Sequence, residues 1–412
     1  MGIFLSEVPV IEGGKSIIGR RIEAWAPIDD DDIKAVVEVL KSGRLSQLVG
    51  TKVQEFENFF ARYHGVKHCI AVSNGSVALY IALKALGVGP GDEVLVPAFT
   101  FVSTATCVVY ANAVPVFVDV SRETFNMDPC DLEDKLRKHR DRAKAVIVVH
   151  LCGHPAEMDD IVKICREYGV YLIEDCAQAV GAEYRGRKVG TFGDLGCFSF
   201  YQTKNLTTGE GGAIITNNDE LAKLCKMIRC HGEETRYEHV MLGFNFRMTE
   251  LQAALGISQL RKLDRLNERR REIAKVYTEA LSKSDLLILP SEKPYVKHVW
   301  HIYNVLLHVE KMRVSRDYFV KALKAEGAIV SVCYPKPIYR QLLFQELRGH
   351  GKGCPWSCPY YGKTISYKDI KCPNTEWICE RVFTLYTFPT LSNEDAELMA
   401  KAVLKLLNYY RK

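Results

Sequence analysis

The feature that most constrains the fold of this chain is an alternation of short apolar runs and helical patterns between residues 67 and 217. Helical spacing over 76–86 follows the first run, and similar patterns separate the later ones. Strands joined by helices pair in parallel, because each crossover brings the chain back to the same edge of the sheet. We therefore predict an α/β fold with a mostly parallel central sheet and flanking helices. The expected strands cover residues 69–72, 93–97, 116–120, 145–150, 171–174 and 195–200.

The length of 412 residues exceeds the usual size of one domain and predicts two. We expect an N-terminal arm and helix over residues 1–44 and a large α/β domain over 45–260. Residues 261–412 are expected to form a long linking helix and a smaller C-terminal α/β domain. A final strand is predicted at 385–389, and an amphipathic helix from Asn393.

Two of the expected strands end beside residues that carry chemistry. One ends at the acidic pair Glu174 and Asp175, and another ends shortly before Lys204 and a glycine-rich segment. Ligands of parallel sheets bind outside the carboxyl ends of the strands. In pyridoxal-phosphate (PLP) enzymes a lysine holds the cofactor's aldehyde and an acid partners its pyridinium nitrogen. A loop lysine is ordinarily a solvated charge, so the setting alone makes Lys204 a candidate, with Asp175 preferred over Glu174 as the acid.

Two further segments follow expected strands. Gly75 and Ser76 begin a predicted helix, whose free N–H groups can hold a phosphate. The alternative is a plain helix cap by Asn74 or Ser76. Phe101 follows the next strand and could stack on an aromatic ring. Phe99 is the second candidate, and packing in the core is the alternative for both.

The resemblance of this chain to a known family rests on two stretches, which read EDCAQAVGAEYRGRKVGTFGD and SFYQTKNLTTGEGG. They are similar to the DegT-type sugar aminotransferases, PLP-dependent enzymes with the aspartate-aminotransferase fold (fold type I). The resemblance implies that Lys204 forms the resting Schiff base and moves protons, and that Asp175 partners the pyridine nitrogen. It also implies cofactor contacts from Gly75, Ser76, Phe101, Gln178 and Ser199.

Other consequences of the resemblance concern the assembly and the reaction. Asn245 matches an asparagine that reaches the cofactor phosphate of the neighbouring subunit, which implies a homodimer with shared active sites. His301 and Tyr334 are weaker candidates for substrate contacts, and each also fits a structural role. Some relatives that dehydrate sugars have histidine in place of Lys204, so the lysine favours transamination.

We therefore expect an aminotransferase that moves an amino group from L-glutamate or L-glutamine to a keto sugar, expected to be nucleotide-linked. The alternative acceptor is a cyclitol ketone of the scyllo-inosose type, which the variant at 201–203 and a cysteine-bearing insertion favour slightly. A regulatory, DNA-binding or non-catalytic relative is the alternative of another class. It would require a basic recognition helix, and no helix-turn-helix pattern is evident.

Composition excludes several other classes. A net charge of +5 is too small to indicate nucleic-acid binding by itself. No apolar run approaches the length of a membrane span, and residues 1–10 lack a secretory leader, so we expect a cytoplasmic enzyme with no membrane partner. No metal site is predicted. A cluster in the insertion region is compatible with packed thiols, a disulfide or a metal, although its spacing suits zinc poorly. It comprises Cys354, Cys358, Cys372 and Cys379.

Overall fold

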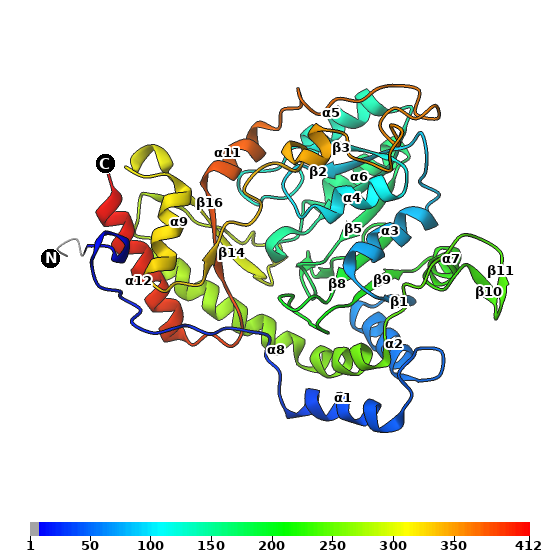
Figure 1. The fold of residues 1–412 in the computed structure, drawn as a ribbon, viewed down its shortest axis with the longest axis horizontal. Helices are drawn as coiled ribbons and strands as arrows, with labels where there is room; N and C mark the ends of the chain where they lie inside the picture. The colour runs from blue at the N-terminus through cyan, green and yellow to red at the C-terminus, as the bar shows by residue number, and fades with distance from the viewer. Residues whose placement is uncertain (1–7) are drawn as a thin grey trace.

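The computed structural model describes residues 8–412, so the first seven residues of the predicted arm lie outside the described part. Its centre is a seven-stranded sheet with the strand order β1-β9-β8-β5-β4-β2-β3 (Figure 1). The prediction of a mostly parallel sheet is confirmed. The strands are β1 (His68–Val72), β2 (Glu93–Pro97), β3 (Val114–Val118), β4 (Ala143–Val149), β5 (Tyr171–Asp175), β8 (Leu195–Ser199) and β9 (Gly212–Thr216).

Strand β9 is the one that runs against the others, because it is antiparallel to both β1 and β8. The sequence analysis did not predict this strand. It follows β8 after the loop of residues 200–211, which contains Lys204 and no helix, so the chain returns antiparallel to β8. Its insertion places the end of β1 beside the end of β8, and Gly212 pairs with both Val72 and Ser199.

Helices cover both faces of this sheet. On one face lie α3 (Gly75–Ala85), α4 (Ser103–Tyr110) and α7 (Asp219–Arg229), which share one apolar cluster with the sheet. The other face is divided between two pairs of helices. Helices α5 (Pro129–His139) and α6 (Met158–Tyr168) cover one half, whereas α2 (Lys52–His64) and α8 (Glu250–Leu281) cover the other. The sheet is therefore buried on both sides, as its continuously apolar strands require.

A second, smaller sheet lies beside the C-terminal half of α8 (Figure 1). All its strand pairs are antiparallel, and its order is β12-β14-β16-β15. Its strands are β12 (Leu287–Ile288), β14 (Ile302–Leu307), β15 (Val330–Ser331) and β16 (Val382–Tyr386), and it packs with α9 (Arg316–Ala325) and α12 (Asn393–Tyr410). The final strand begins and ends three residues before the predicted 385–389, because pairing with β14 starts at Val382. Helix α8 crosses residue 260, so the division into 45–260 and 261–412 stays a prediction.

The N-terminal segment contacts the smaller sheet first and helix α8 after it. Its first turn is η1 (Val10–Glu12), and Ile18 and Ile22 join the apolar cluster of the smaller sheet. Helix α1 (Asp30–Ser42) lies along α8, where Lys262 pairs with Asp29 and Asp32. The remaining elements are short: η2 (Leu151–Gly153), β6 (Glu183–Tyr184), β7 (Arg187–Lys188), β10 (Glu233–Thr235), β11 (Glu238–His239), β13 (Val296–Lys297), η3 (Val309–Lys311), η4 (Ile338–Arg340), α10 (Leu342–Gln345) and α11 (Pro373–Arg381). Within residues 8–412, no helix has both the length and the apolar character needed to cross a membrane.

Candidate active site

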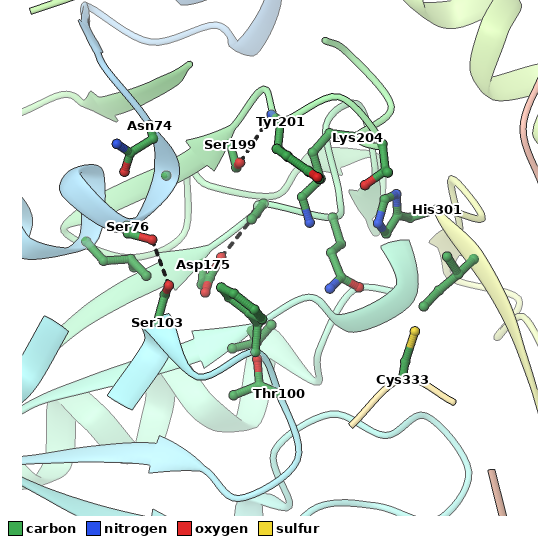
Figure 2. Close-up of a pocket in the computed structure, with 18 of the residues that line it drawn as sticks. Asn74, Ser76, Thr100, Ser103, Asp175, Ser199, Tyr201, Lys204, His301 and Cys333 are labelled. Carbon is green, nitrogen blue, oxygen red and sulfur yellow. Dashed lines mark hydrogen bonds between the residues drawn. The ribbon is translucent and has the colours of Figure 1, made fainter. Parts of the chain in front are cut away.

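A cavity of about 790 Å³ lies at the carboxyl ends of the parallel strands, where ligands of such sheets bind. One side of it is formed by the loops that follow β1, β2, β5 and β8. The other side comes from the smaller sheet and its connections, through residues 301–302, 333–334 and 386–388. Figure 2 shows Lys204, His301 and Cys333 converging on this space with Asp175 and the serines of the strand ends. Every predicted site residue except Asn245 lines the cavity.

Lys204 lies in the loop that leaves β8, and its backbone N–H donates to the carbonyl of Tyr201 at 2.8 Å. Loss of solvent around the amine lowers the pKa of Lys204 to about 8, although the charge of Asp175 opposes that shift. A lysine of this kind is partly neutral near physiological pH and can act as a nucleophile or a base, which an ordinary exposed lysine does poorly.

Asp175 is the acid that faces the cavity. Its Oδ1 accepts from the N–H of Ala177 at 3.1 Å, and its Oδ2 accepts from the hydroxyl of Thr104 at 3.0 Å. Burial raises the pKa of Asp175, whereas these two hydrogen bonds and the charge of Lys204 act in the opposite direction. Each oxygen keeps a further lone pair, so the carboxylate can still accept from a cationic N–H in the cavity.

Glu174, the second candidate for the acid, points away from the cavity. Its carboxylate is fully buried and accepts hydrogen bonds from the N–H groups of Gly190, Phe192 and Gly193 and from the ring of His150. These contacts hold the chain just before β8. Alternation of side chains along a strand separates Glu174 from Asp175 in this way. Possible ligand atoms of His150, Glu174 and Cys176 lie within 4.8 Å of one another, but hydrogen bonds already use the carboxylate.

The N-terminus of α3 forms the far end of the cavity. Asn74 caps this helix by accepting from the N–H of Val77 at 2.9 Å, so the cap proposed as an alternative is present. Ser76 does not cap the helix, because its hydroxyl bonds to that of Ser103 at 2.6 Å. A Cβ on Gly75 would lie 2.6 Å from the Cβ of Ser199. Glycine therefore lets β8 approach the helix end, which gathers three serines around its free N–H groups.

Gln178 is fixed by two neighbours. Its Oε1 accepts from the N–H of Cys152 at 2.8 Å, and its Nε2 donates to the hydroxyl of Tyr334 at 2.9 Å. The second hydrogen on Nε2 stays available to a ligand in the cavity. Tyr334 has a positive φ of 56°, which is uncommon for a bulky residue and indicates local strain at the site.

The two phenylalanines after β2 lie in different surroundings. Phe101 is 56% exposed and lines the cavity, whereas Phe99 is buried and packs edge-on against Tyr334. Phe101 is therefore the ring that a planar ligand can reach.

Asn245 lies outside the cavity of its own chain. It is exposed and forms an isolated bridge with Cys230, next to the projecting hairpin β10–β11 (Figure 1). Phe244, its neighbour, is 65% exposed. An exposed aromatic side chain beside an exposed amide suits contact with a second subunit. The shared-site prediction for Asn245 stays a prediction.

The sequence analysis missed several residues of this site. Thr104 and Ser103 were not singled out, although both lie in the first turn of helix α4, just after Phe101. His150, which supports Glu174, lies at the end of β4 and could have been found by the strand-end signal that marked Phe101. Cys333 and Asn205 had no such signal, because their positions depend on contacts between distant segments.

The four cysteines of the insertion region do not form one site. Cys358, Cys372 and Cys379 are buried in three different apolar clusters, and all four thiols are free. The structure thus agrees with packed thiols. The insertion itself packs against the edge of the large sheet, where the hydroxyl of Tyr367 donates to the carbonyl of Pro115.

Comparisons with known proteins agree with the family resemblance seen in the sequence. Residues 27–404 match the model of the DegT/DnrJ/EryC1/StrS aminotransferase family. The chain is 36% identical to the UDP-N-acetyl-3-dehydro-alpha-D-glucosamine 3-aminotransferase of Acidithiobacillus ferrooxidans, over 93% of this chain and 96% of that protein. It is 41% identical to the GDP-perosamine synthase of Caulobacter vibrioides, over 74% and 82%. The solved structure of Helicobacter pylori PseC, an aminotransferase involved in pseudoaminic acid biosynthesis, has a TM-score of 0.84 at 28% identity, covering 95% and 100%.

Proposed function

The chain belongs to the DegT/DnrJ/EryC1/StrS aminotransferase family of PLP-dependent enzymes, and we propose that it moves an amino group from L-glutamate or L-glutamine to a nucleotide-linked keto sugar. One observation carries the proposal. A desolvated lysine and a buried carboxylate, Lys204 and Asp175, line the same cavity, whose far end is a helix N-terminus.

The residues of the cavity fit PLP. The N-terminus of α3, with Ser76 and Ser199, would hold the phosphate, because a bulkier residue at Gly75 would push β8 out of the cradle. Phe101 would cover the ring. When bound, PLP supplies an electron sink for the carbon next to the amino group, which the side chains lack.

Asp175 and Gln178 would fix the ring's electronic state and orientation. Asp175 has two hydrogen bonds that favour its ionised form, so it would accept from a protonated ring nitrogen. Gln178 has its oxygen occupied by Cys152, so it presents an N–H to the ring oxygen. We propose that Asn245 reaches the phosphate of the partner subunit's site, which would make the enzyme a homodimer with shared sites.

Lys204 would hold the aldehyde carbon through Nζ and then, released as a free amine, carry the proton that moves between the donor's α-carbon and the cofactor. Its lowered pKa supports both tasks, because a neutral amine is needed to attack and to take up a proton. Lys204 would move the proton in the opposite direction when the nitrogen passes to the ketone of the acceptor.

The choice of acceptor rests on the relatives. The names of two of them contain nucleotide-linked sugars, which supports a nucleotide-linked sugar over a cyclitol ketone. The cysteine-bearing insertion, which favoured a cyclitol, contributes no side chain to the cavity, whose lining passes from Tyr334 to Tyr386. The remaining support for a cyclitol is the variant at 201–203, of which Tyr201 and Thr203 line the cavity.

The test is the visible absorption spectrum of the purified protein with PLP, before and after L-glutamate or L-glutamine is added. We expect a band that the correct donor removes and that a keto sugar restores; nucleotide sugars and scyllo-inosose are compared as acceptors. Lys204→Ala should abolish both changes. Lys163→Ala, an exposed lysine on α6, is the matched control and should retain them. A wild-type protein that gives no band with PLP would contradict the proposal.

A further inference from the structure

His301 is held in one orientation by a chain of amides. Its Nδ1 lies 3.0 Å from the Oδ1 of Asn205. The Nδ2 of Asn205 donates to the Oδ1 of Asn267 at 2.8 Å and to the carbonyl of Val299 at 2.9 Å, and Asn267 in turn donates to the carbonyl of Val180. The amide of Asn205 therefore cannot be reversed, and its oxygen must accept from His301. The hydrogen of the neutral ring is on Nδ1, and Nε2 is a hydrogen-bond acceptor.

The backbone of His301 is fixed as firmly as its ring. Its N–H donates to the carbonyl of Cys152 at 2.8 Å, and its carbonyl accepts from Arg270 at 3.2 Å. Arg270 is buried on α8 and has no carboxylate partner in the structure between residues 8 and 412. Burial, together with the charges of Lys204 and Arg270, lowers the pKa of His301 far below its ordinary value. Burial and these two charges thus favour the neutral imidazole.

The free nitrogen of this ring belongs to the cavity. His301 is 6% exposed and lines the cavity beside Lys204 (Figure 2). Its Nε2 has no hydrogen-bond partner among the side chains and backbone that the structure describes. Once a ligand has displaced water from the cavity, this acceptor requires a donor from the ligand, because leaving it unpaired is unfavourable.

The two substrates differ in what they can offer this atom. The carboxylates of glutamate and glutamine only accept hydrogen bonds, and the carboxamide N–H groups of glutamine lie at the far end of its side chain, away from the reacting α-carbon. The amino group of either donor would be taken up at the aldehyde carbon that Lys204 holds. A keto sugar or cyclitol, in contrast, has hydroxyl groups beside the ketone. We propose that Nε2 of His301 accepts a hydrogen bond from a hydroxyl near the reacting ketone and so determines acceptor specificity. This inference rests on the proposed function and adds a residue that acts in only one of its two half-reactions.

The first test follows the cofactor band separately in the donor and acceptor half-reactions. In His301→Leu, kcat/KM of the acceptor half-reaction should fall about 10- to 100-fold, as expected for a buried acceptor lost from a neutral hydrogen bond. The donor half-reaction should change less than about threefold. His301→Gln, which can place an oxygen near the same point, should recover part of the loss. His298→Leu is the matched control, because His298 is also buried and neutral but does not line the cavity.

The second test uses a pH signature that a structural role would not produce. In Asn205→Asp the new carboxylate should raise the pKa of His301, so that the ring is protonated as the pH falls and Nε2 becomes a donor. On the acid side, the acceptor half-reaction of this variant should then lose activity by a larger factor than the donor half-reaction, because only the acceptor uses Nε2.

Three outcomes overturn the inference. It is wrong if both half-reactions of His301→Leu fall by the same factor, or if its acceptor half-reaction matches that of His298→Leu. It is also wrong if Asn205→Asp folds and its acceptor half-reaction follows the wild-type pH profile. A wild-type enzyme that fails in the donor half-reaction contradicts the proposed function itself and this inference with it.

Discussion

Replacing Thr104 with valine removes one hydrogen bond from Asp175 and changes little else. Thr104 is fully buried, and its hydroxyl donates to Asp175 at 3.0 Å and lies 3.3 Å from the hydroxyl of Thr100. Valine has nearly the same shape and is also β-branched, so helix α4 and the packing around it are preserved. The perturbation therefore acts on the ionised carboxylate and not on the fold.

The size of the effect follows from the geometry. A hydrogen bond to a charged group contributes about 1.5–3 kcal/mol. The pKa of Asp175 should therefore rise in Thr104→Val, because the ionised carboxylate loses this hydrogen bond. This adds to the upward shift that burial already causes. A carboxylate that is harder to ionise partners the cofactor's ring nitrogen less well, so the donor half-reaction should slow by about 10- to 100-fold.

The assay is stopped-flow absorbance of the cofactor band with a saturating amino donor, repeated across a range of pH. The acid limb of the rate profile should move to higher pH in Thr104→Val. Thr106→Val is the matched control, since Thr106 lies on the same helix and does not line the cavity. If both variants slow equally, or if the acid limb of Thr104→Val does not move, the assignment of Thr104 as a support for Asp175 is refuted.

Three further predictions concern other parts of the site. Gly75→Ala should weaken PLP binding and lower the unfolding free energy by about 1–3 kcal/mol, because the new Cβ would lie 2.6 Å from the Cβ of Ser199. Equilibrium titration with PLP measures the affinity, and urea unfolding measures the stability. An unchanged affinity would contradict the phosphate cradle. The rate at which the apoenzyme captures PLP should rise with pH through about 8, where Lys204 loses its proton. Asp175→Asn should move that rise to lower pH, since the carboxylate's charge raises the pKa of Lys204, and a shift in the other direction would be inconsistent with this account. Asn245→Ala and Lys204→Ala should each be inactive alone. When the two variants are mixed and exchange subunits, about half of the dimers should be mixed and contain one intact site, so about a quarter of the wild-type activity should return. No recovery despite subunit exchange would exclude a shared site.

The elements of the fold that were predicted correctly are those that the local sequence pattern determines. The parallel strands are continuously apolar and bounded by turns, so each was found to within a few residues, and β2 was found with its exact ends. Strand β9 was missed because nothing in its sequence distinguishes an antiparallel return from another parallel strand. The division of Glu174 and Asp175 between core and cavity also needed the structure, since either could have faced inwards.

Within the site, local sequence pattern positions one group of residues, and contacts between distant segments position another. The residues proposed to hold PLP follow strand ends of one sheet, so a regular sequence pattern places them and a shared cofactor can be recognised from sequence. The acceptor side is built differently. His301 owes its orientation to Asn205, and its neutral state to burial and the charges of Lys204 and Arg270, which lies on a different element. Substitutions at such distant supports can alter the acceptor side while the strand-end residues proposed to hold PLP are retained. Relatives named for different sugars are what this division of the site would allow.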